Sequence, residues 1–181
     1  MVARRFFKLF RFVFLRVHLR GACRLRGRGP LIVVSNHEGS FGPLSLVTSL
    51  PLELHPWVVS ETTDARTAAR RIQAEFLEAE LHLRPPFSAW LARAVARIAA
   101  ALMRDLDVVP VYQKSRTVRV TVERSVELLA QGKNILVFPE DPARKLNDVL
   151  CHFCAGFVHL AQRYYERTRR AVLFLPVAVN R

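Results

Sequence analysis

The residue best suited to chemistry in this chain is a histidine at the end of a short apolar run. Leu31 to Val34 lead into Ser35-Asn36-His37, and a Gly42-Pro43 pair follows. A hydroxyl is a poor nucleophile until a base removes its proton, and a neutral imidazole can do so near pH 7. His37 is therefore a candidate general base. The alternative is a histidine in a tight turn, bonded to the backbone around it.

Three acidic side chains are candidates for orienting this imidazole. Glu38 is adjacent to His37, while Glu140 and Asp141 follow another apolar run. The carboxyl ends of parallel strands meet at one edge of a sheet, so Glu140 and Asp141 are expected near His37. Our hypothesis is that one of the three carboxylates orients the His37 ring, and Glu140 is the second candidate catalytic residue. A solvated loop acid is the alternative for Glu140.

Cationic side chains near the ends of two further apolar runs could contact an anionic substrate. Lys114 and Arg116 follow the run that ends near Tyr112, and Arg144 follows Asp141 after two residues. Solvated surface positions are the alternative for each of them, because arginine and lysine are common on protein surfaces.

A metal site is not expected, although one segment has the spacing of metal ligands. Cys151-His152-Phe153-Cys154 would need further ligands, and Cys23 is the only other cysteine. Structural zinc sites use four good ligands. We interpret the segment as small residues on a buried helix. Three cysteines also give no disulfide framework, which indicates a reducing compartment.

The elements that must position these residues can be predicted from apolar runs and helix breakers. Alternating strands and helices predict a single α/β domain, with a largely buried mixed or parallel sheet flanked by helices. Pro110 indicates an edge strand or a bulge, and Gly132 a helix end. The expected strands cover residues 31–35, 57–59, 108–112, 134–138 and 172–179. One helix is expected to start at Pro43, and four others are expected to cover residues 65–81, 89–104, 117–131 and 153–169.

Composition adds a strong preference for anionic partners. The chain has 181 residues, is 51% hydrophobic and carries a formal net charge of +13. This length fits one domain with a substantial core. Lipid headgroups, nucleic acid and an acidic carrier protein all suit the charge. We do not expect nucleic acid, because no nucleic-acid-binding motif is present.

The first 28 residues hold much of this charge and contain no acid. On a helical wheel they form a charge-free apolar stripe with arginines and a lysine on the other side. We predict that residues 1–28 form a basic amphipathic helix in a membrane interface. Residues 29–181 are predicted to form the α/β domain that holds the candidate catalytic residues. A helix packed on its own domain is the alternative. Arginines interrupt every apolar run before the ~20 residues that a membrane span needs. The residues of the stripe are Phe6, Phe7, Phe10, Val13, Phe14 and Val17.

Four short segments, in order along the chain, resemble the four sequence blocks of the glycerolipid acyltransferases, which include lysophosphatidic acid and glycerol-3-phosphate acyltransferases. The family aspartate of the first block is replaced by Gly42, and the arginine of the second block by Gln113. In the third block, Asp141-Pro142-Ala143 stands where the family has Gly-Thr-Arg. The apolar scaffold is thus kept while polar side chains differ. The segments are residues 35–37, 107–113, 137–142 and 174–179.

The resemblance implies a glycerol-3-phosphate-acyltransferase-like fold and a specific reaction. An acyl group would pass from acyl-CoA or acyl-ACP, as co-substrate, to a lysophospholipid or a related hydroxyl acceptor. His37 would be the base, and no cofactor would be needed. The protein would be peripheral, on the cytoplasmic side of a membrane. The alternative is a catalytically weak or inactive lipid-binding or acyl-binding relative. The candidate substrate-binding residues are Asn36, Glu38, Lys114, Arg116, Asp141 and Arg144.

Overall fold

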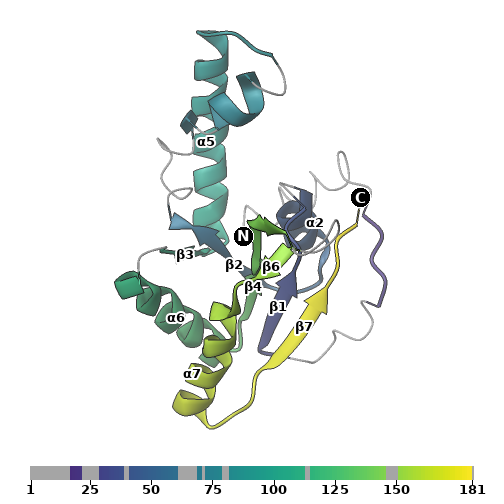
Figure 1. Cartoon of the computed structure of the whole chain (residues 1–181), viewed down its shortest axis with the longest axis vertical. Coiled ribbons are helices and arrows are strands. Elements are labelled where there is room, and N and C mark those ends of the chain that lie inside the picture. The colour runs from purple at the N-terminus through teal and green to yellow at the C-terminus, as the bar shows by residue number, and fades with distance from the viewer. Residues whose placement is uncertain are drawn as a thin grey trace.

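The apolar runs of the sequence form the strands of one parallel sheet, and the amphipathic segments form helices around it (Figure 1). A computed structural model describes residues 17–21, 29–38, 41–60, 69–70, 72–78, 82–112, 115–145 and 151–180. Its elements are β1 (Leu31–Ser35), α2 (Phe41–Ser49), β2 (Leu54–Val59), the π-helical η2 (Ile72–Glu78), α5 (Phe87–Asp105), β3 (Val109–Val111), α6 (Ser115–Ala130), β4 (Asn134–Val137), β5 (Glu140–Lys145), β6 (Cys151–Phe153), the 3-10 turn η3 (Ala155–Phe157), α7 (Val158–Thr168) and β7 (Leu173–Val177).

The sheet has the order β3-β2-β4-β1-β7, and all its neighbouring strands are parallel. In β1, Ile32 pairs with Ile135 of β4 on one side and with Phe174 of β7 on the other. β1 and β4 are buried along nearly their whole length. Parallel strands that are covered on both faces need continuous apolar sequence, which explains the runs at residues 31–34 and 135–137.

Different helices cover the two faces of the sheet. On one face Ile32 packs with Leu129 of α6 and Leu160 of α7, and on the other Val33 packs with Leu46 of α2. Each fully buried aliphatic side chain of this kind contributes about 1.5–3 kcal/mol by leaving water. The α/β fold with a buried sheet between helices is therefore confirmed.

Two details of the sequence prediction are also confirmed. β3, which contains Pro110, is one of the two edge strands of the sheet. Proline cannot donate a ladder hydrogen bond, and an edge strand tolerates that loss. Gly132 follows α6 with a φ of +79°, the left-handed conformation that favours glycine at a helix end.

The region after β4 differs from the prediction. Residues 153–169 were expected to form one helix, but Phe153 belongs to β6, and α7 begins only at Val158. β5 and β6 form an antiparallel hairpin outside the main sheet. The interpretation of residues 151–154 as part of a buried helix is therefore wrong, since Cys154 is also exposed.

The basic N-terminal segment lies mostly outside the described residues. Within it, residues 17–21 are not helical, and Gly21 has a φ of +78°. The predicted interfacial helix elsewhere in residues 1–28 stays a prediction. No helix in the described ranges is both long and apolar enough to cross a membrane.

α5 stands apart from the two helical layers. It is part of the connection between β2 and β3. Its Phe87 end projects well beyond the strands on the carboxyl side of the sheet (Figure 1). η2 packs along it, and Ala69 and Ala96 form a small separate cluster there.

Candidate active site

His37 and Glu140 meet at the carboxyl edge of the sheet. His37 lies just beyond β1, and Glu140 begins β5 just beyond β4, the strand paired with β1. The backbone N–H of His37 donates a hydrogen bond of 2.8 Å to Oε2 of Glu140, across 103 residues of sequence. The expectation that the two residues converge on one rim therefore agrees with the geometry.

The His37 ring rests against an aromatic side chain. Its centroid lies 5.0 Å from that of Phe138, with the rings at 71° in an edge-to-face arrangement. Phe138 is itself packed against the core beneath α2, so it gives the imidazole a fixed apolar support. The His37 side chain is exposed, and a substrate hydroxyl can therefore reach it.

Asn36 ties the ends of two strands together. Its Nδ2 donates to the carbonyl of Val179, and its Oδ1 accepts from the backbone N–H of Val179, both at 2.8 Å. These bonds span 143 residues and hold the turn after β1 against the segment after β7. Asn36 thus fixes the backbone from which His37 projects, and its own carboxamide is engaged by that contact.

Gly42 stands where the family has aspartate, and it packs closely against the His37 turn. It lies in the first turn of α2, directly against the turn that holds His37. A Cβ atom at this position would overlap the His37 carbonyl oxygen, and would lie 2.8 Å from the carbonyl carbon and 3.2 Å from the carbonyl oxygen of Asn36. Any side chain, aspartate included, would force backbone to move.

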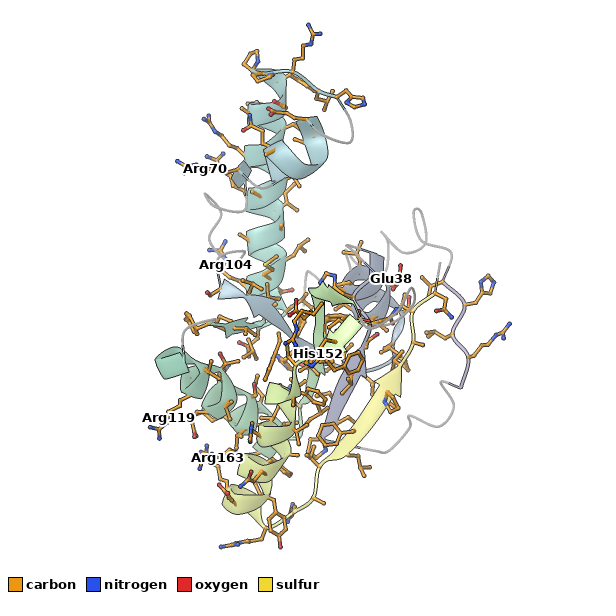
Figure 2. All side chains as sticks on the ribbon, in the orientation of Figure 1. Glu38, Arg70, Arg104, Arg119, His152 and Arg163 are labelled. Carbon is orange, nitrogen blue, oxygen red and sulfur yellow. The ribbon has the colours of Figure 1, made fainter. Side chains whose placement is uncertain are left out.

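The other candidate carboxylates occupy different positions. Glu38 is exposed and adopts a left-handed φ of +40°; it is labelled in Figure 2, close to the start of α2. Asp141 is half-buried in β5 and lies opposite His152 in the hairpin. Glu140, the third, accepts the backbone N–H of His37 as described above.

Of the three candidate cations, Arg144 is the one whose side chain the structure describes. Arg144 is exposed on β5. Lys114 lies outside the described residues, and Arg116 lies in the first turn of α6, where its side chain is not described. α6 follows β3, which is three strands from β1 in the sheet. At about 4.8 Å per strand, β3, which leads into α6, lies roughly 14 Å from β1 in the sheet.

Sequence reasoning assigned no separate role to Phe138, to Val179 or to the hairpin. Phe138 precedes Pro139-Glu140, so its place at the strand end was a usable signal. The backbone role of Val179 leaves no trace in its side-chain type. The hairpin closes on the same loop, because the N–H of Cys154 donates to the carbonyl of Pro139 at 2.8 Å. It therefore braces the residue that precedes Glu140.

The amino edge of the sheet is built differently. A cavity of about 300 Å³ opens there, lined among others by His55, Asp107 and Lys133, far along the strands from His37. Arg124 donates two hydrogen bonds, of 3.0 and 2.7 Å, to the Asp107 carboxylate. Those bonds raise the pKa of Arg124, which keeps this guanidinium charged. In the described ranges, no three His, Cys, Asp or Glu side chains gather in a way that could hold a metal ion.

Comparison with known proteins identifies the family. The family described as Acyltransferase matches residues 75–180, more than half of the chain. This match contains β4, Glu140, the hairpin and β7, whereas the Asn36-His37 turn lies before it. No curated protein and no solved structure matches the chain. The extent of the family match, together with the parallel sheet and its carboxyl-edge site, shows that this chain belongs to the acyltransferase family.

Proposed function

We propose that the protein is a membrane-peripheral O-acyltransferase with His37 as its general base. The donor is an acyl thioester of coenzyme A or of acyl carrier protein, and the acceptor is a lysophospholipid or a related amphiphilic alcohol. The observation that supports this proposal best is the exposed His37 imidazole, whose backbone is held by Glu140 at the carboxyl edge of an acyltransferase-family fold.

The proposed reaction needs no covalent enzyme intermediate. An imidazole nitrogen of His37 takes the proton of the acceptor hydroxyl, and the oxygen attacks the thioester carbonyl carbon. A C–O bond forms, the C–S bond breaks, and the departing thiolate receives the proton from the imidazolium. A positioned base contributes about 10²–10⁴-fold to such a step.

Glu140 acts in this proposal as a positioning residue. Its carboxylate accepts the His37 N–H and so fixes the direction in which the imidazole leaves the backbone. This contact is made by the His37 backbone, so it supports Glu140 as the carboxylate that positions the turn, while the hypothesis that one of Glu140, Glu38 and Asp141 orients the ring stays a prediction. Alanine at residue 140 should lower kcat on the order of tenfold, because the turn loses its anchor. Glutamine, which can still accept the N–H, should restore much of that loss.

The alternative is a relative that binds lipid or acyl chains without turnover. Its support is Gly42, whose packing against His37 leaves no room for the carboxylate of the family. The assay uses the purified full chain, acyl-CoA and a lysophospholipid, with release of free thiol and formation of diacyl product as readouts. His37→Ala should abolish turnover, while His159→Ala, which removes an exposed imidazole from α7, should not. Turnover that survives His37→Ala would contradict the general base. Absence of turnover in the unmodified chain across donors and acceptors would favour the binding protein.

The proposed membrane contact of residues 1–28 has its own test. The protein should bind vesicles of anionic lipid, and added salt should weaken that binding because salt screens exposed charges. Deletion of residues 1–20 should reduce it. Unchanged vesicle binding after that deletion would contradict the predicted anchor.

A further inference from the structure

Amphipathic helices usually bury their large apolar side chains, whereas α5 buries small residues and leaves large apolar side chains exposed. Its buried residues are the small Ser88, Ala92 and Ala96, and they face the η2 side, where Ala96 meets Ala69. Both of its aromatic side chains and two of its branched aliphatic side chains are exposed instead. Phe87, Trp90, Val95 and Ile98 are 56%, 66%, 40% and 55% exposed. We refer to these four residues as the α5 apolar surface.

The four residues form a broad stripe along one side of α5. At about 100° per residue, positions 87, 90, 95 and 98 fall within about 140° of one another around the helix. The stripe runs for roughly 16 Å at 1.5 Å per residue. The rings of Phe87 and Trp90 stack at its tip, with centroids 6.4 Å apart and planes at 29°.

Arginines line one side of the stripe. Arg93, Arg97 and Arg104 are exposed, and each lies within about a third of a helical turn of the direction of Trp90. Figure 2 labels Arg104 near the base of α5. α5 contains no acidic residue before Asp105, its last residue.

The aromatic residues and arginines of the α5 apolar surface indicate what kind of partner binds there. A second copy of the chain would bring two sets of arginines together, which is unfavourable. Tryptophan and phenylalanine with neighbouring arginines suit the interface of an anionic bilayer, where rings enter the headgroup layer and guanidinium groups meet phosphates. The net charge of +13 acts in the same direction.

We propose that the α5 apolar surface is a docking site for an anionic lipid bilayer. Its tip projects beyond the carboxyl edge of the sheet (Figure 1), so lipid that receives Phe87 and Trp90 lies on the His37 side of the molecule. The delivery of a lipid acceptor to His37 rests on the proposed function. The bilayer contact itself does not, and it is separate from the predicted contact of residues 1–28.

Tryptophan fluorescence tests the contact at this position. The chain has two tryptophans, Trp57 and Trp90, and residues 1–28 contain none. Trp57 lies in β2 and donates a hydrogen bond to Ser125, so it reports on the folded core. In the full-length Trp57→Phe variant, vesicles of phosphatidylcholine mixed with phosphatidylglycerol should shift Trp90 emission to the blue, and brominated acyl chains should quench it. Pure phosphatidylcholine should have a weaker effect.

The outcomes that overturn the proposal are distinct. Protein that co-sediments with anionic vesicles while Trp90 emission stays unchanged binds through another segment. A shift that follows protein concentration without lipid indicates self-association. If Trp57→Phe does not fold, the quenched fraction of the unmodified protein, compared with that of Trp90→Phe, gives the same information.

A pair of double variants measures the size of the effect. Trp90→Ala with Ile98→Ala should lower the vesicle partition coefficient about tenfold or more, because two large apolar side chains no longer enter the interface. The matched control is Val118→Ala with Val120→Ala, which removes exposed apolar groups from α6. Equal partition of the two double variants would overturn the proposal. His37→Ala should bind vesicles normally, so a failure of the catalytic proposal stays distinguishable from a failure of this one.

Discussion

At both edges of the parallel sheet, an asparagine side chain forms hydrogen bonds with the backbone of distant segments. At the carboxyl edge, the carboxamide of Asn36 holds the backbone of Val179 with two bonds of 2.8 Å. At the amino edge, Asn134 accepts from the N–H of Leu31 at 3.1 Å and donates to the carbonyl of Glu53 at 3.0 Å. Both asparagines join strand ends that are distant in sequence. Only the first holds a turn that presents an exposed imidazole.

The histidines at the two edges show what this difference means. His37 is exposed at the carboxyl edge, with its backbone N–H on a carboxylate. His55 is 5% exposed at the amino edge, and its Nδ1 lies 3.1 Å from the carbonyl oxygen of Asp107. Burial makes a polar side chain part of the packing, whereas exposure leaves it available to a substrate. We therefore expect the carboxyl edge to govern activity and the amino edge to govern stability.

The largest expected effect separates the two histidines directly. His37→Ala should lower acyl transfer by about 10²–10⁴-fold, because the base is lost. Its free energy of unfolding should stay within about 0.5 kcal/mol, as for other exposed sites. His55→Ala should cost about 1–3 kcal/mol, because a buried partner of Asp107 is removed. Denaturant titration and turnover per folded molecule measure both. Loss of activity in correctly folded His55→Ala would break the comparison.

The next effect separates the two asparagines. Asn134→Ala should lower the free energy of unfolding by about 2–4 kcal/mol, because the N–H of Leu31 and the carbonyl of Glu53 lose a buried partner. Asn36→Ala should cost less stability, since its surroundings are only half-buried. It should instead lower kcat about tenfold, because the turn that carries His37 loosens. Equal stability losses with unchanged turnover would contradict the assignment of the Asn36 contact to the site.

A glycine pair tests how tightly the carboxyl edge is packed. Gly42→Ala should destabilise the fold by about 1–3 kcal/mol, since the new Cβ meets the His37 backbone. Gly156→Ala is the matched control, because a Cβ there meets nothing within 4 Å. Gly42→Asp should not raise activity, although it restores the family residue. Thermal unfolding and turnover of the three variants check this, and an active, stable Gly42→Asp would show that the turn adapts.

The smallest effect concerns the helices beyond the carboxyl edge. Glu78 Oε1 accepts hydrogen bonds from Gln73 and Ser88, both at 2.8 Å, and these bonds lower the pKa of Glu78. A lowered pKa stabilises the fold above the ordinary pKa of glutamate, and this stabilisation is lost as the pH falls through the lowered value. Glu78→Gln should therefore be slightly less stable at neutral pH, and the difference should vanish in acid. A difference that persists in acid would point to packing instead.

The sequence predicted the framework well, because strand and helix signals are local. β1 has the predicted bounds, and Pro110 marks an edge strand as expected. The β5–β6 hairpin was missed because Asp141-Pro142 and the charged residues after it lack the alternation of a strand. β2 begins earlier than predicted, since His55 and Pro56 interrupt its apolar pattern.

The site was predictable in its residues and less so in its contacts. Four ordered blocks indicated His37 and Glu140, and the structure brings these two together. The close approach of Gly42 to the His37 backbone is a three-dimensional contact that no residue type reveals. The exposure of the α5 apolar surface likewise depends on three-dimensional packing. Apolar periodicity defines a stripe, but only the packing of small residues against η2 decides which side is buried.

The central place of β1 has a consequence for how the protein is made. β1 is an early strand, yet its two neighbours in the sheet are β4 (Asn134–Val137) and β7 (Leu173–Val177). A growing chain on the ribosome therefore carries β1 as an unpaired apolar strand until β4 has been synthesised. Pairings this distant form slowly and leave apolar surface open to aggregation. The yield of soluble protein should consequently depend on chaperone supply and on expression temperature more than on the stability of the finished fold.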